Sequence, residues 1–287
     1  MAGERFVVAA AAPLLEALAA HFPTWSRNTL RQRLRLGCVR VDGDVVARGD
    51  QPVVAGAVVE VFAKGEGEVA GHDARDLPVL HDGDDLLAID KPAGLLSVAS
   101  DDERERTALA QMRARLQARD RDAELLPVHR LDRETSGVLL FARSRAIRDA
   151  VQAAWGEVEK VYVAIVAGRL DPPTGTIDAP LWEDRNLRVH AGRHPDARDA
   201  VTHYRTLRAD RHRSEVELTL ATGRKHQIRV HLASRGCPIV GDDRYGQRDA
   251  RLFLHSQRLV LPHPRDGRPI ELVAAVPPEF RRALGAR

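Results

Sequence analysis

Residues 129–143 read His-Arg-Leu-Asp-Arg-Glu-Thr-Ser-Gly-Val-Leu-Leu-Phe-Ala-Arg, a charged half followed by an apolar half. The apolar run from Gly137 to Ala142 is short and follows turn residues, which predicts a buried strand. The residues Thr135–Gly137 favour a turn, in which the glycine is free to take a positive φ. Asp132 is therefore expected on a loop that a core strand holds in place, a common way to present a catalytic group.

Taken alone, an aspartate among arginines is most often a solvated or ion-paired surface group. A protein-kinase catalytic loop is excluded, because it needs Asp directly after His-Arg and here Leu131 intervenes. The nine residues His129–Gly137, followed by the apolar strand and Ala142, closely resemble the catalytic signature of the RluA family of pseudouridine synthases. That resemblance implies an isomerase that converts uridine to pseudouridine within RNA, without a redox step and without a cofactor.

The length and composition describe a globular protein that can form one large and one small domain. The chain has 287 residues, of which 44% are hydrophobic and 30% charged, with a net charge of +3. Basic residues cluster, with six Arg in residues 27–48 and eight in residues 185–213, while residues 66–90 are acidic. Such blocks suit phosphate-backbone binding on chosen faces, and the alternative is an arginine-rich solvated surface.

The two cysteines and the absence of long apolar runs bound the location of the protein. Cys38 and Cys237 form no CxxC pair, which argues against a disulfide framework or a zinc site and fits a reducing cytosol. No run reaches the roughly 18 apolar residues of a membrane span. The alanine-rich N-terminus only faintly resembles a signal peptide, because Pro13 and Glu16 interrupt it. We expect a cytoplasmic monomer that does not enter a membrane.

The first 65 residues predict a small α+β domain. Amphipathic spacing indicates a helix over residues 14–22, and Ser26 is a plausible N-cap for a second, basic helix. A hairpin with Asp-Gly at its turn follows near residue 42, and residues 53–62 are expected to form a closing strand pair. These elements resemble the RNA-binding domain first known from ribosomal protein S-four. The resemblance implies that Arg27, Arg31 and Arg35, on one face of the basic helix, contact RNA.

The remainder of the chain predicts a linker and a catalytic domain. We place the boundaries at residues 1–65 for the S-four-like domain, 66–78 for the linker and 79–287 for the pseudouridine synthase domain. Residues 86–90 read as a strand, and the following Lys-Pro-Ala-Gly resembles the family's first motif, in which we expect Lys91 to be structural. The family usually places Pro soon after, whereas this chain has Leu96-Ser97-Val98. Residues 101–124 are expected to form a charged helical insertion near the substrate cleft.

Three further strands are predicted over residues 159–168, 200–205 and 215–220, the second of them edge-like. The first contains Lys-x-Tyr-x-Ala, which resembles the family's second motif, and the third leads into residues 222–231, which resemble the third motif. The predicted fold is α+β, with a mixed, mainly antiparallel sheet. The two histidines of the third motif are five residues apart rather than four, so no zinc site is expected.

The resemblance also assigns roles to the site residues. Asp132 would be the catalytic carboxylate, and whether it attacks as a nucleophile or removes a ribose proton stays open. Arg229 would pair with it, and Tyr162, which alone would more often be a core residue, would stack on the uracil. The expected RNA-contacting residues are Arg130, which would fill the space that the target base vacates, His129 and Thr135, which would shape the loop, and Arg224 and His226.

Three alternatives remain for the function. A non-catalytic RNA-binding or ribosome-assembly factor on the same scaffold would be expected to lose Asp132, Tyr162 or Arg229, and all three are present. A hydrolase using Asp132 as a general base would act on free nucleosides or depend on a metal. Among RNA substrates, two-domain members of the family mostly modify large-subunit ribosomal RNA, which we expect here, with transfer RNA as the alternative.

Overall fold

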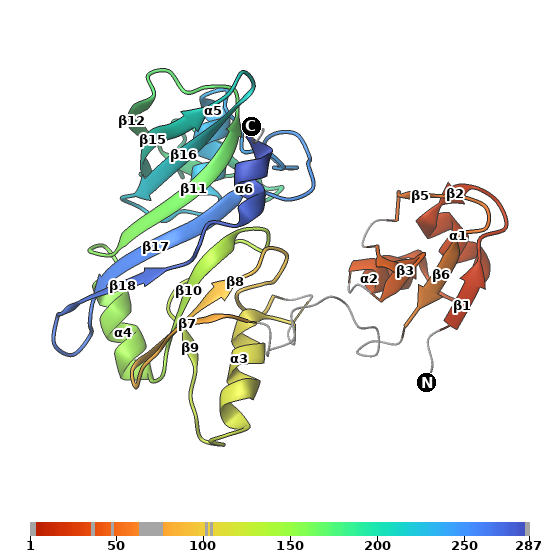
Figure 1. The fold of residues 1–287 in the computed structure, drawn as a ribbon, viewed down its shortest axis with the longest axis horizontal. Helices are drawn as coiled ribbons and strands as arrows, with labels where there is room; N and C mark the ends of the chain where they lie inside the picture. The colour runs from red at the N-terminus through yellow and green to blue at the C-terminus, as the bar shows by residue number, and fades with distance from the viewer. Residues whose placement is uncertain are drawn as a thin grey trace. The chain divides into compact units, whose positions relative to one another are not determined.

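A computed structural model describes residues 4–35, 38–46, 49–62, 77–100, 103 and 106–284. The chain divides into two compact units, Met1–His72 and Asp73–Arg287, which are described separately (Figure 1). The linker predicted for residues 66–78 lies outside the described residues, apart from Leu77 and Pro78. Among the described residues, no helix is long and apolar enough to cross a bilayer.

The N-terminal unit consists of two helices packed on small antiparallel sheets. Helix α1 (Leu14–His21) and helix α2 (Arg27–Arg35) bury leucines in one core, including Leu18 and Leu30. The Ser26 hydroxyl accepts a hydrogen bond from Thr29 N at 3.1 Å, which confirms the predicted N-cap. A four-stranded sheet has the order β1-β6-β3-β4, and β2 pairs with β5. The strands are β1 (Glu4–Val7), β2 (Ala12–Pro13), β3 (Val39–Val41), β4 (Asp44–Val45), β5 (Pro52–Val53) and β6 (Val58–Val61).

The hairpin prediction is confirmed, and the closing strand pair is wrong. Asp42 and Gly43 join β3 to β4 with φ values of 51° and 88°, as a tight hairpin turn requires. Strands β5 and β6 do not pair with each other, because β5 pairs with β2 while β6 lies between β1 and β3. Strand β1 was not predicted, and it supplies the partner that β6 was expected to find in β5.

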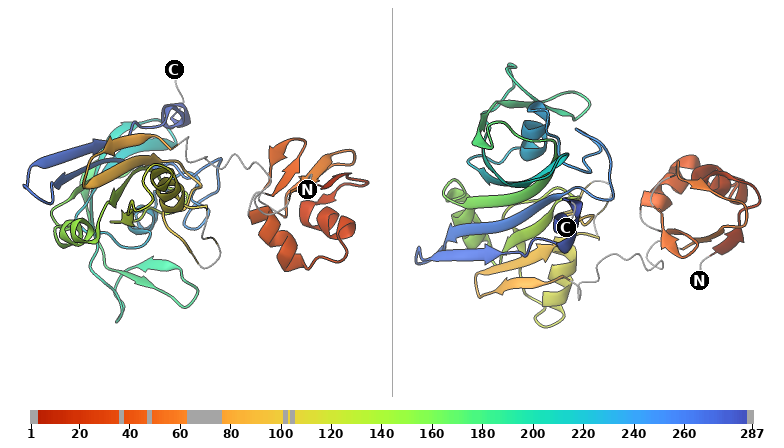
Figure 2. Two further views of the ribbon diagram at one scale, coloured as in Figure 1. Left: turned by 90° about the horizontal axis from the view of Figure 1, so that it is seen from below. Right: turned by 45° about the horizontal axis from the view of Figure 1, so that its top comes forward.

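The C-terminal unit is built on one large sheet, as the prediction of an α+β fold with a mixed, mainly antiparallel sheet requires. Its strand order is β12-β15-β16-β11-β17-β10-β8-β7, with β18 beside β17 and β9 beside β10 (Figure 1 and Figure 2). Strands β10 and β17 are parallel, and the other pairs are antiparallel.

The strands of this unit are β7 (Val79–Asp82), β8 (Leu86–Lys91), β9 (Leu126–Pro127), β10 (Ser136–Ala142), β11 (Glu159–Ala167), β12 (Thr174–Asp178), β15 (Val201–Ala209), β16 (Arg213–Leu220), β17 (Leu254–Pro262) and β18 (Pro269–Val273). A separate hairpin pairs β13 (Leu181–Glu183) with β14 (Val189–Ala191). The helices are α3 (Ala108–Gln117), α4 (Arg145–Ala153), α5 (Gln227–Ser234) and α6 (Pro278–Ala283).

Strand β10 is buried along its whole length and contributes to a core on each face of the sheet. Leu139 and Phe141 join the cluster that also contains residues of α3, α5 and α6, whereas Val138 and Leu140 join the cluster under α4. This alternation is the period of two that a strand imposes. Two apolar faces explain why the run is continuously hydrophobic rather than alternating with polar residues.

Gly137 permits the parallel pairing of β10 with β17. Its φ is +111°, and a Cβ at this position would lie 2.1 Å from the backbone oxygen of Ser256. The positive φ was predicted, but the turn lies at Arg133 and Glu134 rather than at Thr135–Gly137, because Ser136 and Gly137 already belong to the strand. The strand therefore starts directly after the loop that carries Asp132.

Two further predictions need correction. Strand β15, expected to be edge-like, is paired on both sides, and β12 forms the edge of the sheet. Strand β12 was missed because it has the sequence Thr-Gly-Thr-Ile-Asp after two prolines, which reads as a loop. Within residues 101–124, the helix spans only Ala108–Gln117, with Thr107 as its N-cap.

Candidate active site

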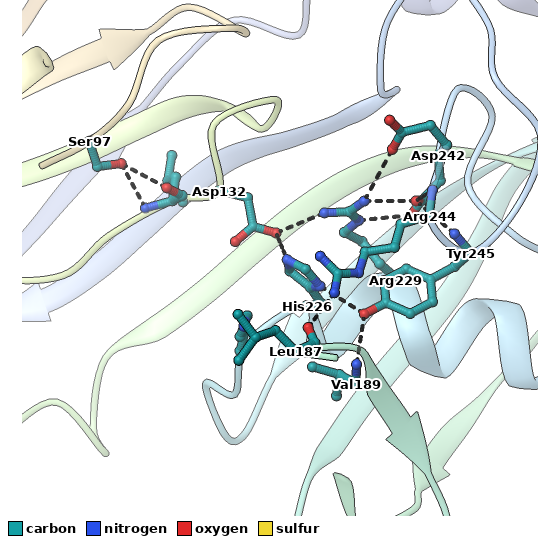
Figure 3. A network of polar contacts seen from close by, with 12 residues as sticks. Ser97, Asp132, Leu187, Val189, His226, Arg229, Asp242, Arg244 and Tyr245 are labelled. Atoms are coloured by element: carbon teal, nitrogen blue, oxygen red, sulfur yellow. Dashed lines mark hydrogen bonds and ion pairs between the residues drawn. The ribbon is translucent and has the colours of Figure 1, made fainter. Parts of the chain in front are cut away.

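The loop that presents Asp132 lies between β9 and β10, and a serine fixes it from one side. The Ser97 hydroxyl accepts a hydrogen bond from Leu131 N at 3.0 Å and donates one to Leu131 O at 2.8 Å. Within the loop, Thr135 N donates to Asp132 O at 3.1 Å. Figure 3 shows Ser97 on one side of Asp132, with Arg229 and His226 on the other. Sequence reasoning did not single out Ser97, because its role depends on a hydrogen bond to a residue 34 positions away.

Arg133, which follows Asp132, is held by Lys91 and Gly94. The Arg133 carbonyl accepts hydrogen bonds from Lys91 Nζ at 3.1 Å and from Gly94 N at 2.9 Å. Lys91 is fully buried and also donates to the carbonyls of Pro92 and Leu95. Burial lowers the pKa of Lys91 to about 7, while three carbonyl acceptors match the three N–H donors of an ammonium group. These contacts agree with a structural role for Lys91.

Arg229, on helix α5, contacts Asp132 but is bound mainly by another carboxylate. Its Nη1 lies 3.4 Å from Asp132 Oδ2, as the expected pairing requires. Its Nε and Nη2 donate to the two oxygens of Asp242 at 2.8 and 2.7 Å, a bidentate pair. Burial by itself raises the pKa of Asp242, but the hydrogen bonds and charge of Arg229 outweigh it and lower that pKa. Asp242 thus holds the guanidinium in place beside Asp132.

His226 is a second nitrogen donor beside the Asp132 carboxylate. Its Nε2 lies 3.7 Å from Asp132 Oδ2, and its Nδ1 lies 2.8 Å from the Tyr245 hydroxyl. That hydroxyl accepts a hydrogen bond from Val189 N at 3.2 Å, so its own proton is available to Nδ1. This hydrogen bond favours the tautomer in which Nε2, the nitrogen nearer to Asp132, carries the ring proton. Burial lowers the pKa of His226 to about 4, so the ring is neutral at neutral pH.

The backbone at His226 is unusual as well. This residue precedes the first turn of α5 with φ +55°, the left-handed conformation that non-glycine residues rarely adopt. Such conformations persist where the surrounding structure fixes them, and they concentrate at functional sites. Here the conformation places the imidazole between Tyr245 and Asp132. Sequence reasoning listed His226 as an RNA contact and missed both Tyr245 and Asp242.

A cavity of about 520 Å³ is lined by Asp132, His226 and Arg229. Tyr162, on β11, lines it and is only 9% exposed, and burial raises the pKa of Tyr162 to about 12, so the phenol stays protonated. All eight site residues predicted within the catalytic domain line this cavity: His129, Arg130, Asp132, Thr135, Tyr162, Arg224, His226 and Arg229. Residues from β11, α5 and the loop before β10 therefore meet at one place, although they are far apart in the sequence.

The predicted RNA-contacting residues in this cavity differ in their surroundings. His129 Nε2 accepts a hydrogen bond from Leu140 N at 3.0 Å, and the ring stacks on Trp155 at 4.9 Å. Burial lowers the pKa of His129 to about 4, so the ring is neutral at neutral pH and supports the loop by these two contacts. Arg130 is exposed at the cavity wall, and Arg224 Nε donates to Asp199 O at 3.1 Å.

The N-terminal arginines belong to the other unit. Arg27 and Arg31 line a hollow of about 550 Å³, together with Glu16 and Asp50. The side chain of Arg35 lies outside the described residues. Within the part of the chain that the structure describes, no group of three or more His, Cys, Asp or Glu is arranged to hold a metal ion.

The catalytic unit thus presents one aspartate, oriented by two nitrogen donors, at the wall of a cavity that a protonated tyrosine also lines. Residues 85–234, which are 150 of the 287 residues, match the family described as RNA pseudouridylate synthase. The chain therefore belongs to this family, and it is an RNA pseudouridine synthase, an isomerase that modifies RNA. The family and the names of the relatives support an isomerase over the hydrolase and the non-catalytic factor.

Relatives cover nearly the whole chain. It is 39% identical over 278 residues to an uncharacterized RNA pseudouridine synthase of Chloroflexus aurantiacus, covering 93% of this chain and 87% of that protein. It is 35% identical over 295 residues to the ribosomal large subunit pseudouridine synthase D of Xanthomonas campestris pv. campestris, covering 94% and 87%. Among solved structures, human RNA pseudouridylate synthase domain containing 4 aligns with a TM-score of 0.64 at 28% identity, covering 75% of this chain and 95% of that one.

Proposed function

We propose that this enzyme converts specific uridines of large-subunit ribosomal RNA to pseudouridine, with Asp132 as its catalytic carboxylate. The observation that carries the proposal is a single cavity lined by Asp132, Arg229 and Tyr162, in which Arg229 lies beside Asp132. The similarity to a large-subunit enzyme over 94% of this chain supports ribosomal RNA over transfer RNA.

The reaction moves the uracil from a nitrogen–carbon to a carbon–carbon bond with the ribose and leaves the elemental composition unchanged. The glycosidic bond breaks, the uracil turns over, and a ring carbon bonds to the ribose. That carbon then loses its proton, and the ring nitrogen released from the ribose gains one. Two routes start from a carboxylate at this position, namely addition to the ribose and removal of a ribose proton. Both need an ionised Asp132 held still, which is the role we assign to Arg229 and His226.

Tyr162 and Arg130 complete the proposed site. The ring of Tyr162 offers a face on which the uracil stacks inside the cavity. A uridine in a stem or structured loop must leave its stack to reach Asp132, at a cost of a few kcal/mol. Arg130, two residues from Asp132 and exposed at the cavity wall, fills the space that the base leaves.

The function is tested by a transcriptome-wide map of pseudouridine in a strain that lacks this gene. The strain is complemented with the wild-type gene or with Asp132→Asn. We expect one or more positions in large-subunit ribosomal RNA to be lost and to return only with the wild type. A lost position in transfer RNA would overturn the substrate assignment, and restoration by Asp132→Asn would overturn the role of Asp132.

We further propose that the N-terminal unit is an S-four-like RNA-binding domain. Its support is the basic helix α2, capped by Ser26, from which Arg27 and Arg31 reach a surface hollow. A module of this kind grips structured RNA by shape and by phosphate contacts, which adds affinity without chemistry.

Removing residues 1–72 should weaken RNA binding and flatten its salt dependence. Each lost phosphate contact lowers the slope of log affinity against log salt by roughly 0.7–0.9, so two or three lost contacts are readily measured. Filter binding of the full chain and of residues 73–287 to the same ribosomal RNA fragment over a salt series measures this. An unchanged affinity and slope would show that the N-terminal unit is not a major RNA grip.

A further inference from the structure

The turn between β13 and β14 carries an exposed leucine in a strained conformation. Leu187 is 62% exposed, and its φ is +58°, in the left-handed region. Exposure leaves the apolar side chain in water, and the left-handed backbone is sterically unfavourable for leucine. Glycine or asparagine would adopt this backbone more easily. Asn186 occupies the position just before it, so a residue suited to this conformation is only one place away. An outlier of this kind is a reason to look for a function of the side chain.

The turn, residues 184–188, is fixed rather than loose. Asp184 Oδ1 accepts hydrogen bonds from Asn186 N at 2.8 Å and Arg188 N at 2.9 Å. Asp184 N donates a hydrogen bond to Arg188 O at 2.9 Å, and Leu187 N donates one to Asp184 O at 2.9 Å. His190 holds the other oxygen of Asp184 at 2.8 Å. The position of Leu187 is therefore set before any ligand arrives.

The same turn is attached to the groups that hold Asp132. Leu187 O accepts a hydrogen bond from the Arg244 side chain, and Arg244 N donates to Asp242 at 3.0 Å. Val189, just after the turn, donates to Tyr245, the hydrogen-bond partner of His226. Figure 3 shows Leu187 together with Arg244, the residue that donates to its carbonyl oxygen. Hydrogen bonds thus connect the turn that carries Leu187 to the residues that hold Arg229 and His226 beside Asp132.

The chemistry around Leu187 suits a nucleotide. Arg185 and Arg188 flank it within the turn, and both are exposed. An apolar side chain between cations can contact the face of a base while its neighbours meet phosphates. Apolar side chains also act as wedges that keep neighbouring bases apart. A strand of RNA that delivers a uridine to Asp132 brings its adjacent nucleotides to this part of the surface.

We propose that Leu187 packs against the base next to the target uridine and keeps the stack open while the uridine is in the cavity. This rests on the proposed function, in which the target leaves its stack. The proposal assigns to the turn a contact with a neighbouring nucleotide, distinct from the role of Arg130 in filling the vacated position.

The test crosses a change in the protein with a change in the RNA. Full-length wild type, Leu187→Asn and Leu187→Met are assayed on a ribosomal RNA fragment that contains the mapped uridine. The same fragment is also made with an abasic nucleotide on the 5′ side or on the 3′ side of that uridine. Asn tolerates the left-handed backbone while removing the apolar surface, and Met keeps the surface apolar. Leu207→Asn, at an exposed leucine on β15, is the matched control.

On the intact fragment we expect Leu187→Asn to lower kcat/KM on the order of tenfold, with Leu187→Met and Leu207→Asn near wild type. The difference between Leu187→Asn and wild type should vanish on one of the two abasic fragments. Full activity of Leu187→Asn on the intact fragment would overturn the proposal. So would a loss of the same size on all three fragments. Failure of the wild type on every fragment would instead contradict the proposed function.

Discussion

Replacing Asp132 with Asn should reduce turnover on RNA by a thousandfold or more, as an order-of-magnitude expectation for loss of the reacting group. An amide neither attacks the ribose nor accepts its proton. The change keeps the size of the side chain and one oxygen acceptor for Arg229 and His226. Asp242 still holds Arg229, so the cavity should keep its shape and RNA binding should stay within about threefold, less than 1 kcal/mol.

Turnover is measured under single-turnover conditions by mass spectrometry or by release of label from the uracil ring, and binding by filter retention. Glu134→Gln is the matched control, since it removes another carboxylate of the same loop whose side chain is 53% exposed. It should behave as wild type. Substantial activity in Asp132→Asn would place the chemistry on another group.

Breaking the buried pair between Arg229 and Asp242 should cost both stability and activity. Asp242→Leu leaves a guanidinium that is 9% exposed without its bidentate partner, and the carboxylates that remain near it are Asp132 at 3.4 Å and the exposed Asp243 at 4.0 Å. Removing one partner of a buried ion pair typically costs about 3–5 kcal/mol. The lost hold on Arg229 should also lower kcat, because the guanidinium no longer lies fixed beside the carboxylate.

A second substitution separates these two effects. Arg229→Met combined with Asp242→Leu replaces the pair by apolar side chains, which is often neutral for stability. The double variant should recover the part of the free energy of unfolding that is lost by burying an unpaired guanidinium, while its turnover stays low. It should not recover the part lost at Arg244 N and Tyr245 N, which also donate to Asp242. Urea denaturation and single-turnover assays measure the two quantities. Recovery of activity together with stability would show that the pair serves only the fold.

The pH dependence of stability provides a further check on this pair. The pKa of Asp242 is lowered in the folded protein, so its contribution is present above the ordinary range for Asp, about pH 4. It is lost as the pH falls through the lowered value. The double variant should therefore lose less stability than wild type on acidification below pH 4.

Local features of the fold were predictable because their signals lie within a few residues. Strand β10, the turn at Asp42 and Gly43, and the cap of α2 by Ser26 depend on short-range preferences and were confirmed. The choice of strand partners depends on distant segments. The pairings of β5 and β6 and the position of β12 at the sheet edge could not be read from their own residues.

The candidate site divides in the same way. Asp132 and Arg229 are 97 residues apart, and only the resemblance to a family suggested that they meet. Asp242 and Tyr245 lie on a segment after α5 that carries no pattern of its own for a site. Their roles follow from the left-handed backbone at His226 and from the bidentate geometry of Arg229, which exist only once the chain is folded.

In the proposed mechanism, the hydrogen bonds that hold the residues on both sides of Asp132 limit how far this carboxylate can move toward the RNA. Ser97 holds Leu131, while Lys91 and Gly94 hold Arg133, so the carboxylate has little freedom to follow its substrate. The site would then be rigid, and the RNA would have to change its conformation to bring the uridine to Asp132. Spontaneous opening of an RNA helix then becomes part of substrate selection. Of two equally accessible uridines, the one whose neighbouring base pairs open more often would be modified first.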